Sequence, residues 1–195
     1  MIVSLFSYVV VQDSGFAPNP YAGVLTLATC KPRIRARAHS GDWLVGTGSV
    51  HGVGANRVVY AAAVMEVIPI EVYGAIPQFQ EKIPSVSGTE WQLHGDNLYF
   101  RNELNEWQQR RNSHHAAKHI ARDLSGVNVL ICREFWYFGR EAPSLPGDLL
   151  QIAKRGPGHK RIEDPDIMTA LRGWLSRYPN GISGEPFIIR ASRAN

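Results

Sequence analysis

The chain has 195 residues, a hydrophobic content of 44% and a charged content of 19%, which is typical of one packed globular domain and excludes a disordered chain. No stretch reaches the roughly 18 to 20 apolar residues of a membrane helix, and residues 1–11 lack the basic start and cleavage site of a signal peptide. The net charge of +4 is a mild bias toward anionic partners such as nucleic acids. We therefore expect a cytoplasmic protein with no membrane role.

The cysteine content supports a reducing compartment. The chain has two cysteines, Cys30 and Cys132, and both lie in apolar runs that predict buried strands, so we expect no disulfide framework. A Cys30 nucleophile is disfavoured, because a reactive thiol needs exposure.

The first third of the chain alternates extended segments with turns. Residues 2–11 and 24–29 predict strands, since they are rich in Val, Ile, Leu and aromatic residues. Lys31-Pro32 then begins a short basic helix that ends before Gly41. Residues 41–49 contain a turn and a short apolar strand followed by small residues.

The middle of the chain predicts one long strand and one helix. Residues 57–73 give the strongest extended pattern, bent at Pro69, and form a hairpin with the strand before them. Residues 74–91 predict helical turns and a loop, and residues 95–100 a turn that enters a strand. Asn112-Ser113 predicts the N-cap of a helix that runs through Leu124.

The last third begins with an apolar and aromatic strand over residues 127–138. A short helical stretch near residue 150 and a basic loop over 154–161 follow. Asp164-Pro165 starts the clearest helix, in which apolar residues recur at helical spacing until Tyr178-Pro179-Asn180-Gly181 ends it.

The order of these elements predicts an α+β fold. Helices interrupt the strands without alternating with them, which favours a mixed, mostly antiparallel and partly closed sheet with several flanking helices. We expect a single domain over residues 1–195, with a β-rich core at 1–140 and a helical C-terminal extension at 141–195 packed on it. Neither a GxGxxG nor a GxxxxGK[ST] motif is present, so phosphate binding would use other groups.

Several sequence motifs resemble the nucleotide modification associated domain 2 family. They extend over most of the chain, from residue 1 to about residue 161. The motifs are Gly15-Phe16-Ala17-Pro18-Asn19-Pro20, Thr26 to Arg35, Gly41-Asp42-Trp43 with Gly46-Thr47-Gly48-Ser49, and Asp123-Leu124-Ser125-Gly126 with Trp136-Tyr137-Phe138-Gly139.

This resemblance implies a role in bacterial or phage systems that modify nucleic-acid bases, an association that rests on genome context and does not define an activity. The order of strand, short basic helix, Gly-Asp turn and Val-rich strand is also similar to PUA-like domains. Their small pseudo-barrels hold RNA or modified DNA bases, and this second resemblance concerns architecture alone.

Polar and basic side chains around the short helix form the first candidate site, because loop-edge polar groups beside cations can hold a phosphate and contact a base. A capped loop with a solvated helix face is the alternative. The candidates are Asn19, Thr29, Lys31, Arg33, Arg35, Asp42, Thr47 and Ser49.

Other candidates lie outside this helix. Trp43 follows a Gly-Asp turn and is our preferred residue for stacking on a base, although core packing is the commoner fate of Trp43, Tyr99, Trp136 and Tyr137. Asp96 and Asn97 suit either a base edge or an Asx turn. The 154–161 loop, with Lys154, His159 and Lys160, suits a phosphate or plain solvation.

The histidines are the candidates for chemistry. His115 and His119 are four residues apart on the predicted helix, but no third ligand is evident, so we expect no metal and no cofactor. A general-base role is open to either histidine, with Asp96 as a weaker catalytic candidate, while Asp123 could form a plain surface pair with His119.

Three functions follow from these observations. The first is recognition of a nucleotide or nucleic-acid base, with DNA or RNA as the partner. The second is an enzyme that acts on a modified nucleotide, with a His general base and with Asp42 or Asp96 positioning the substrate. The third is a non-catalytic subunit that supports a base-modifying enzyme.

Overall fold

The computed structural model describes residues 2–187 and forms two compact units. Among the described residues, the first unit takes 2–14, 44–61 and 136–187, and the second takes 15–43 and 62–135. The expected single domain over 1–195 stays a prediction, and residues 1 and 188–195 of it lie outside the described residues. None of the helices in 2–187 has the length and apolarity that a membrane span requires.

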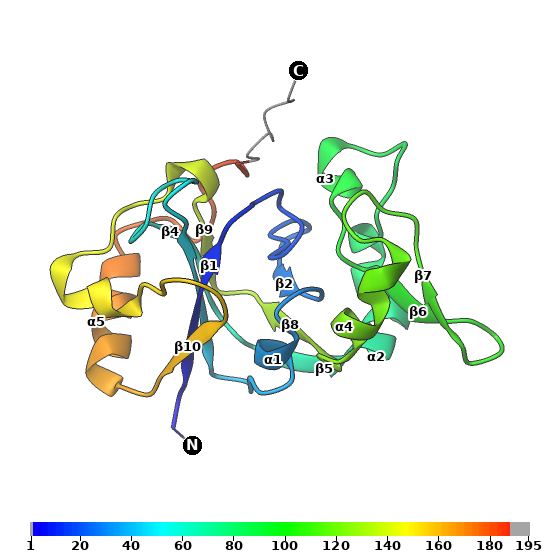
Figure 1. Ribbon diagram of the computed structural model, residues 1–195, viewed down its shortest axis with the longest axis horizontal. Helices are drawn as coiled ribbons and strands as arrows, with labels where there is room; N and C mark the ends of the chain where they lie inside the picture. Colours follow the sequence, from blue (N-terminus) through cyan, green and yellow to red (C-terminus); the bar gives the residue numbers. More distant parts are fainter. Residues whose placement is uncertain (1, 188–195) are drawn as a thin grey trace. The chain divides into compact units, whose positions relative to one another are not determined.

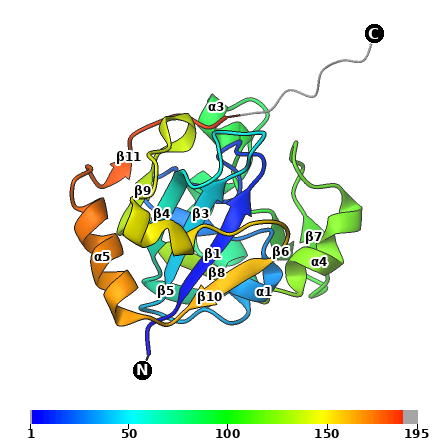
Figure 2. The same ribbon diagram turned by 60° about the vertical axis from the view of Figure 1, so that its left-hand side comes forward.

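The first unit contains most of a six-stranded sheet in the order β10-β1-β3-β4-β9-β11 (Figures 1 and 2). Strand β1 pairs with β10 in antiparallel register and β9 with β11 in parallel. The strands are β1 (Leu5–Val10), β3 (Trp43–Gly48), β4 (Val58–Ala63), β9 (Phe135–Tyr137), β10 (His159–Ile162) and β11 (Gly181–Ile182). Its helices are η3 (Gly139–Glu141), η4 (Gly147–Ile152) and α5 (Pro165–Leu175).

The predicted C-terminal helix is confirmed as α5. The Asp164 side chain caps it by accepting hydrogen bonds from the backbone N–H groups of Asp166 and Ile167, and Pro165 occupies the first turn, where its missing N–H costs nothing. The buried side chains of α5 are Ile167, Met168, Leu171, Trp174 and Leu175. They follow the helical spacing that predicted them.

The second unit contains a three-stranded sheet and a hairpin. The sheet has the order β2-β8-β5, with both pairings antiparallel, and β6 pairs with β7 in the hairpin. Its strands are β2 (Leu25–Leu27), β5 (Glu66–Pro69), β6 (Tyr99–Arg101), β7 (Trp107–Gln109) and β8 (Asn128–Cys132). Its helices are α1 (Pro32–Arg35), α2 (Ile70–Ala75), η1 (Pro77–Lys82), α3 (Glu90–Leu93), η2 (Ala117–His119) and α4 (Ile120–Leu124).

The α+β class and the mostly antiparallel pairing are confirmed. Partial closure as in a PUA-like pseudo-barrel is not confirmed, because among the described strands each sheet is open, with β10 and β11 at the edges of the largest one. The predicted strands at β1 and β3 and the short basic helix α1 are also confirmed.

Four local predictions were wrong. The expected strand at 57–73 divides into β4, β5 and helix α2, which starts directly after Pro69, and the expected strand at 127–138 divides into β8 and β9. The expected helix from Asn112 begins only at residue 117, because the Asn112 carboxamide oxygen accepts from the N–H groups of His114 and His115 and forms a local turn. The basic loop ends at His159, where β10 begins.

Candidate functional site

Cys30 lies in a turn and not in a strand, which corrects the sequence prediction. Strand β2 ends at Leu27, and Cys30 and Lys31 both have left-handed backbone angles, with φ of 57° and 38°. Such angles are strained for residues with a side chain and recur at functional sites. Pro32 then starts α1. The turn leaves Cys30 partly exposed, whereas Cys132 is fully buried in β8.

The turn places Cys30 against an imidazole and a carboxylate, a group that we call the cysteine cluster (Cys30, His115 and Asp123). The Cys30 Sγ atom lies 3.6 Å from His115 Nε2, and His115 Nδ1 lies 2.5 Å from Asp123 Oδ2. A second oxygen of Asp123, Oδ1, accepts a hydrogen bond of 3.0 Å from the backbone N–H of Cys30. Nucleophile, base and orienting carboxylate are thus in the order of a catalytic triad.

The carboxylate of Asp123 is buried and fully hydrogen bonded. Its side chain is 1% exposed, and its Oδ2 atom also accepts 2.7 Å from the Tyr99 hydroxyl. Burial opposes the charged carboxylate, but the hydrogen bonds from His115 and Tyr99 outweigh it and lower the pKa of Asp123. Asp123 is therefore a fixed negative charge beside the His115 ring.

The same contacts hold His115 as an imidazolium. Burial lowers the pKa of His115, but the hydrogen bonds with Asp123 and Cys30 raise it more strongly, to about 9. At neutral pH the ring carries both protons, one toward Asp123 and one toward the Cys30 sulfur. A cationic imidazole next to sulfur is the environment in which cysteine nucleophiles are activated.

Arg35 supports the cysteine cluster through hydrogen bonds to the backbone. Its side chain is fully buried, and it donates to the carbonyl oxygens of Cys30 at 2.8 Å and Asn128 at 2.7 Å and to that of Asp123. Burial lowers the pKa of Arg35 to about 10, against the opposing effect of Asp123. Arg35 thus holds the backbone at these three residues, and its guanidinium is not accessible to solvent.

Two further residues border Cys30 in sequence. Thr29 is buried, and its hydroxyl has no hydrogen-bond partner among the described residues, which is unusual for a buried polar atom. Burial lowers the pKa of the Lys31 ammonium, with Cys30 opposing and Arg122 adding to the decrease. A hydroxyl and a cation therefore flank the thiol.

Aromatic rings enclose the other side of His115. Phe16 stacks on His114 with ring centroids 4.2 Å apart and contacts His115 edge to face at 5.0 Å. His94 Nδ1 lies 2.8 Å from His114 Nε2, and burial together with His94 and His115 lowers the pKa of His114 to about 4. His114 is therefore neutral and packs as an aromatic ring.

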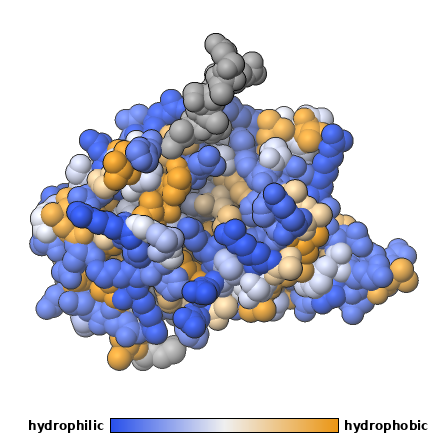
Figure 3. Space-filling model, viewed as in Figure 1, coloured by the Kyte–Doolittle hydropathy of each residue, from blue (hydrophilic) through white to orange (hydrophobic). Residues whose placement is uncertain are grey.

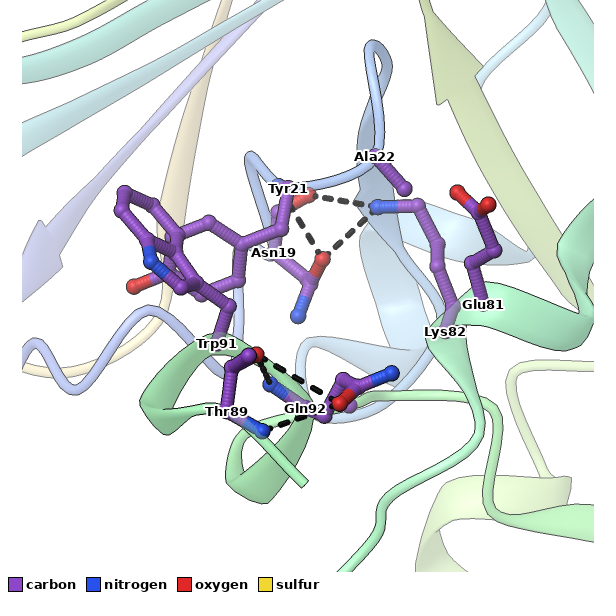
Figure 4. Close-up of a pocket in the computed structure, with 9 residues that line it drawn as sticks. Asn19, Tyr21, Ala22, Glu81, Lys82, Thr89, Trp91 and Gln92 are labelled. Atoms are coloured by element: carbon purple, nitrogen blue, oxygen red, sulfur yellow. Dashed lines mark hydrogen bonds between the residues drawn. The ribbon is translucent and has the colours of Figure 1, made fainter.

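A second buried network, the lysine cluster (Asn19, Lys82 and Asp96), lies in the same unit. Lys82 Nζ donates to the backbone and side-chain oxygens of Asn19 at 3.1 and 2.7 Å and to the Val24 carbonyl at 2.9 Å (Figure 4). Burial lowers the pKa of Lys82 to about 8 and raises that of Asp96, while the opposite charges of the two groups counteract both shifts.

The other predicted binding residues of the second unit are mostly structural. Trp43 is 4% exposed, so it packs in the core, and the Asp42 carboxylate accepts from the His39 backbone N–H. The Asn97 carboxamide donates to the carbonyls of Tyr73 and Phe79. Arg33 is exposed on α1. Tyr99 of this unit, and Trp136 and Tyr137 of the first unit, are 7% exposed or less, which favours the packing alternative.

The remaining predicted binding residues belong to the first unit. They are Thr47, Ser49, Lys154, His159 and Lys160. Thr47 donates to the Tyr8 carbonyl and Lys160 to the Gln151 carbonyl, whereas the Ser49 hydroxyl is buried without a partner in the described part of the chain. Lys154 donates to the adjacent Arg155 carbonyl, and His159 packs on Phe6.

Sequence reasoning named His115 but missed its partners. His119, the other candidate base, lies with its ring 4.8 Å from that of His115 and accepts from the Ala116 N–H instead of facing the sulfur. Asp123 pairs with His115 and not with His119. Within residues 2–187 no group of three or more His, Cys, Asp or Glu side chains is arranged to hold a metal ion.

Comparison with known proteins identifies the family. No curated protein and no solved structure matches the sequence. The sequence pattern described as nucleotide modification associated domain 2 matches residues 2–193, which is nearly the whole chain and extends beyond the 1–161 over which the resemblance was seen. The chain therefore belongs to the nucleotide modification associated domain 2 family.

Proposed function

We propose that this protein is an enzyme that uses Cys30 as a covalent nucleophile on a nucleotide or nucleic-acid base. The observation that carries the proposal is the 3.6 Å approach of Cys30 Sγ to His115 Nε2, with Asp123 holding the other ring nitrogen. The family description, nucleotide modification associated domain 2, is the reason for proposing a nucleotide or base as the substrate. A His base acting on a modified nucleotide was the second sequence hypothesis, and the cysteine now gives that base a partner.

In the proposed first step the sulfur bonds to an electrophilic carbon of the base or nucleotide, and its proton resides on His115 Nε2. His115 then gives this proton to the group that leaves or to the ring atom that gains negative charge. An attacking water or second substrate breaks the carbon–sulfur bond and returns its own proton to His115. Asp123 keeps its charge and orients the ring throughout.

Exposed cations beside the cysteine cluster support an anionic substrate. Helices α1 and α4 contact each other, and Arg33, Arg37, Lys118 and Arg122 on or next to them are exposed. Phosphate contacts of this kind supply affinity without reading sequence. A pure recognition role, the first sequence hypothesis, is the second candidate, and these cations favour it equally.

Thiol alkylation tests the nucleophile. The full chain is treated with iodoacetamide from pH 5 to 9, and the adducts at Cys30 and Cys132 are followed by mass spectrometry. We expect Cys30 to react at pH 6 while the buried Cys132 stays unmodified, and His115→Gln to slow Cys30 alkylation at pH 6 by about 10- to 100-fold. His119→Gln, the matched control, retains the wild-type rate.

Substrate trapping tests the rest of the proposal. The wild type and the His115→Gln variant are incubated with nucleotides, single-stranded DNA and RNA, and duplex DNA, and the intact mass is measured after acid quenching. An adduct that is lost in Cys30→Ala establishes the covalent step. Binding without an adduct, together with a Cys30 that reacts like a free thiol in both variants, would leave the recognition role in its place.

The interaction-subunit hypothesis has little support on the surface in view. Figure 3 shows a face on which hydrophilic residues predominate and the described hydrophobic residues form separate small groups. A protein-docking surface usually presents one larger apolar patch.

A further inference from the structure

A pocket of about 310 Å³ lies in the second unit between the loop at residues 19–22 and the segment at residues 81–95. Its volume falls at the lower end of the range for small-molecule sites, about 300–1,000 Å³. Figure 4 shows the side chains that decide its chemistry, namely Asn19, Tyr21, Glu81, Lys82, Trp91 and Gln92. No step proposed above uses this pocket.

An exposed indole forms one wall of the pocket. Trp91 lies on α3 and is 48% exposed, whereas Tyr21 is 8% exposed and contacts it edge to face with ring centroids 4.1 Å apart. The Tyr21 ring packs against the backbone of Gly15, where a Cβ atom would lie only 2.1 Å from its hydroxyl. A fixed tyrosine therefore holds an accessible indole, which is a platform for stacking a planar ligand.

The pocket has no cation available for a phosphate. Lys82 is the one cation among the lining residues, it is 2% exposed, and carbonyl oxygens accept from it three times. An ammonium group has three donors, so none remains. Glu81 is exposed at the same pocket and adds a negative charge. The ligand is consequently neutral in the part that the pocket encloses.

The polar groups that face a ligand favour a base with N–H donors. The Gln92 oxygen accepts from the Thr89 N–H at 2.9 Å, which fixes the carboxamide and turns its NH₂ group away from Thr89 (Figure 4). The pocket thus offers one amide donor and the Glu81 carboxylate acceptor. A carboxylate pairs best with two adjacent donors, and among the bases guanine presents N1–H and an amino group side by side with the O6 acceptor.

We propose that this pocket binds a guanine-type base or its nucleoside, stacked on Trp91 with its N–H edge toward Glu81. The site does not require the chemistry of Cys30. The pocket and the cysteine cluster nevertheless border one stretch of chain, residues 15–22. Its Asn19 carboxamide donates 2.9 Å to the His94 carbonyl, and its Phe16 packs on His114. The inference therefore goes beyond the covalent step and stands or falls separately from it.

Calorimetric titration of the full chain tests the site, with guanosine, guanosine monophosphate, adenosine and cytidine at low and high salt. We expect guanosine to bind more tightly than adenosine or cytidine. The monophosphate should bind within about threefold of guanosine, and salt should change its affinity little, because no phosphate contact forms in the pocket. The Cys30→Ser variant should bind guanosine as the wild type does.

Two variants locate the binding. Trp91→Ala should weaken guanosine binding by about tenfold or more through lost stacking, and Trp91→Phe should restore part of it. Glu81→Gln should weaken guanosine about tenfold and adenosine much less. Trp107→Ala and Glu106→Gln, which change the same residue types outside the pocket, should bind as the wild type does.

The proposal is overturned by any of three results. They are guanosine binding that Trp91→Ala leaves unchanged, binding that appears only with the monophosphate and disappears at high salt, and the absence of nucleoside binding at millimolar concentrations. None of these results affects the alkylation of Cys30, so failure of the pocket and failure of the proposed covalent chemistry are distinguishable.

Discussion

The cysteine cluster and the lysine cluster are two buried charged networks of the same unit, and they differ in how completely they are hydrogen bonded. In the lysine cluster every ammonium donor has a carbonyl acceptor, and both Asp96 oxygens accept from hydroxyl groups, those of Tyr73 and Thr26. In the cysteine cluster the sulfur has one contact at 3.6 Å. Thr29 beside it has a buried hydroxyl without a described partner. Complete hydrogen bonding suits a structural role, whereas the incompletely bonded thiol is the group to which we assign the proposed chemistry.

Removing the lysine should give the largest effect. Lys82→Ala leaves the buried Asp96 carboxylate and three carbonyl oxygens without their cation, so we expect the free energy of unfolding to fall by about 3–5 kcal/mol. Urea denaturation at pH 7 measures it, with the exposed Lys118→Ala as control. A loss below about 1 kcal/mol would mean that the lysine cluster is not a structural network.

The second-largest effect that we expect is a pH dependence of the free energy of unfolding that arises from His115 in the cysteine cluster. The His115 pKa is about 9 in the folded protein against an ordinary 6.5, so its contribution is complete below pH 6.5 and is lost as the pH rises through 9. The contribution of His115 to the free energy of unfolding should fall over this interval by about 3 kcal/mol at most. Lys82, whose pKa burial lowers to about 8, contributes with the opposite sign as the pH rises above 8. Chemical denaturation across pH 6–10 measures the decrease.

The His115→Gln variant removes the titrating ring, so the decrease in stability that His115 causes should be absent over the same interval. The contribution of Asp123 to stability depends on pH with the opposite sign. Its lowered pKa stabilises the fold above the ordinary carboxylate pKa, and this contribution is lost in acid. Equal pH slopes for wild type and His115→Gln would contradict the assignment of the imidazolium.

Adding one methyl group at Gly126 tests how Arg35 supports the cysteine cluster. A Cβ atom at Gly126 would lie 2.5 Å from the guanidinium carbon of Arg35, and Arg35 cannot move without breaking its bonds to three carbonyls. Gly126→Ala should therefore cost about 1–3 kcal/mol and slow Cys30 alkylation. Gly173→Ala in α5, where the new methyl meets nothing within 4 Å, should instead stabilise by about 0.5–1 kcal/mol.

Tyr99→Phe should have the smallest effect. It deletes one hydroxyl donor to Asp123, which keeps its bonds from His115 and the Cys30 backbone. We expect a loss of about 1–2 kcal/mol in the free energy of unfolding and a Cys30 alkylation rate within a few-fold of wild type. A larger decrease in rate than in His115→Gln would show that the tyrosine, and not the histidine, controls the thiol.

The sequence predicted correctly those helices and strands that short stretches of residues specify by themselves. Pro32 and Asp164-Pro165 mark helix starts with their own chemistry, and the apolar runs of β1 and β3 are buried as expected. The strand expected at 57–73 failed because a Val-rich run predicts burial without distinguishing β5 from helix α2. Tertiary contacts decide which part of such a run forms a strand and which part forms a helix.

The candidate site was only partly predictable. His115 was identified by residue type, but its partners stand 85 and 8 residues away, and no spacing rule joins them. Cys30 was assigned to a strand because it follows an apolar run. The adjacent Lys-Pro was the one signal that the chain turns there, since a helix start requires the preceding residues to leave the strand.

The loop over residues 15–22 contributes Tyr21 to the pocket and Phe16 to the packing around His114 and His115. This loop therefore contacts both the pocket and the rings around the cysteine cluster. If a bound base and a covalent adduct on Cys30 favour the same arrangement of this loop, each stabilises the other by the same coupling free energy. In that case guanosine raises the equilibrium stability of the adduct by the same factor by which the adduct raises the affinity for guanosine.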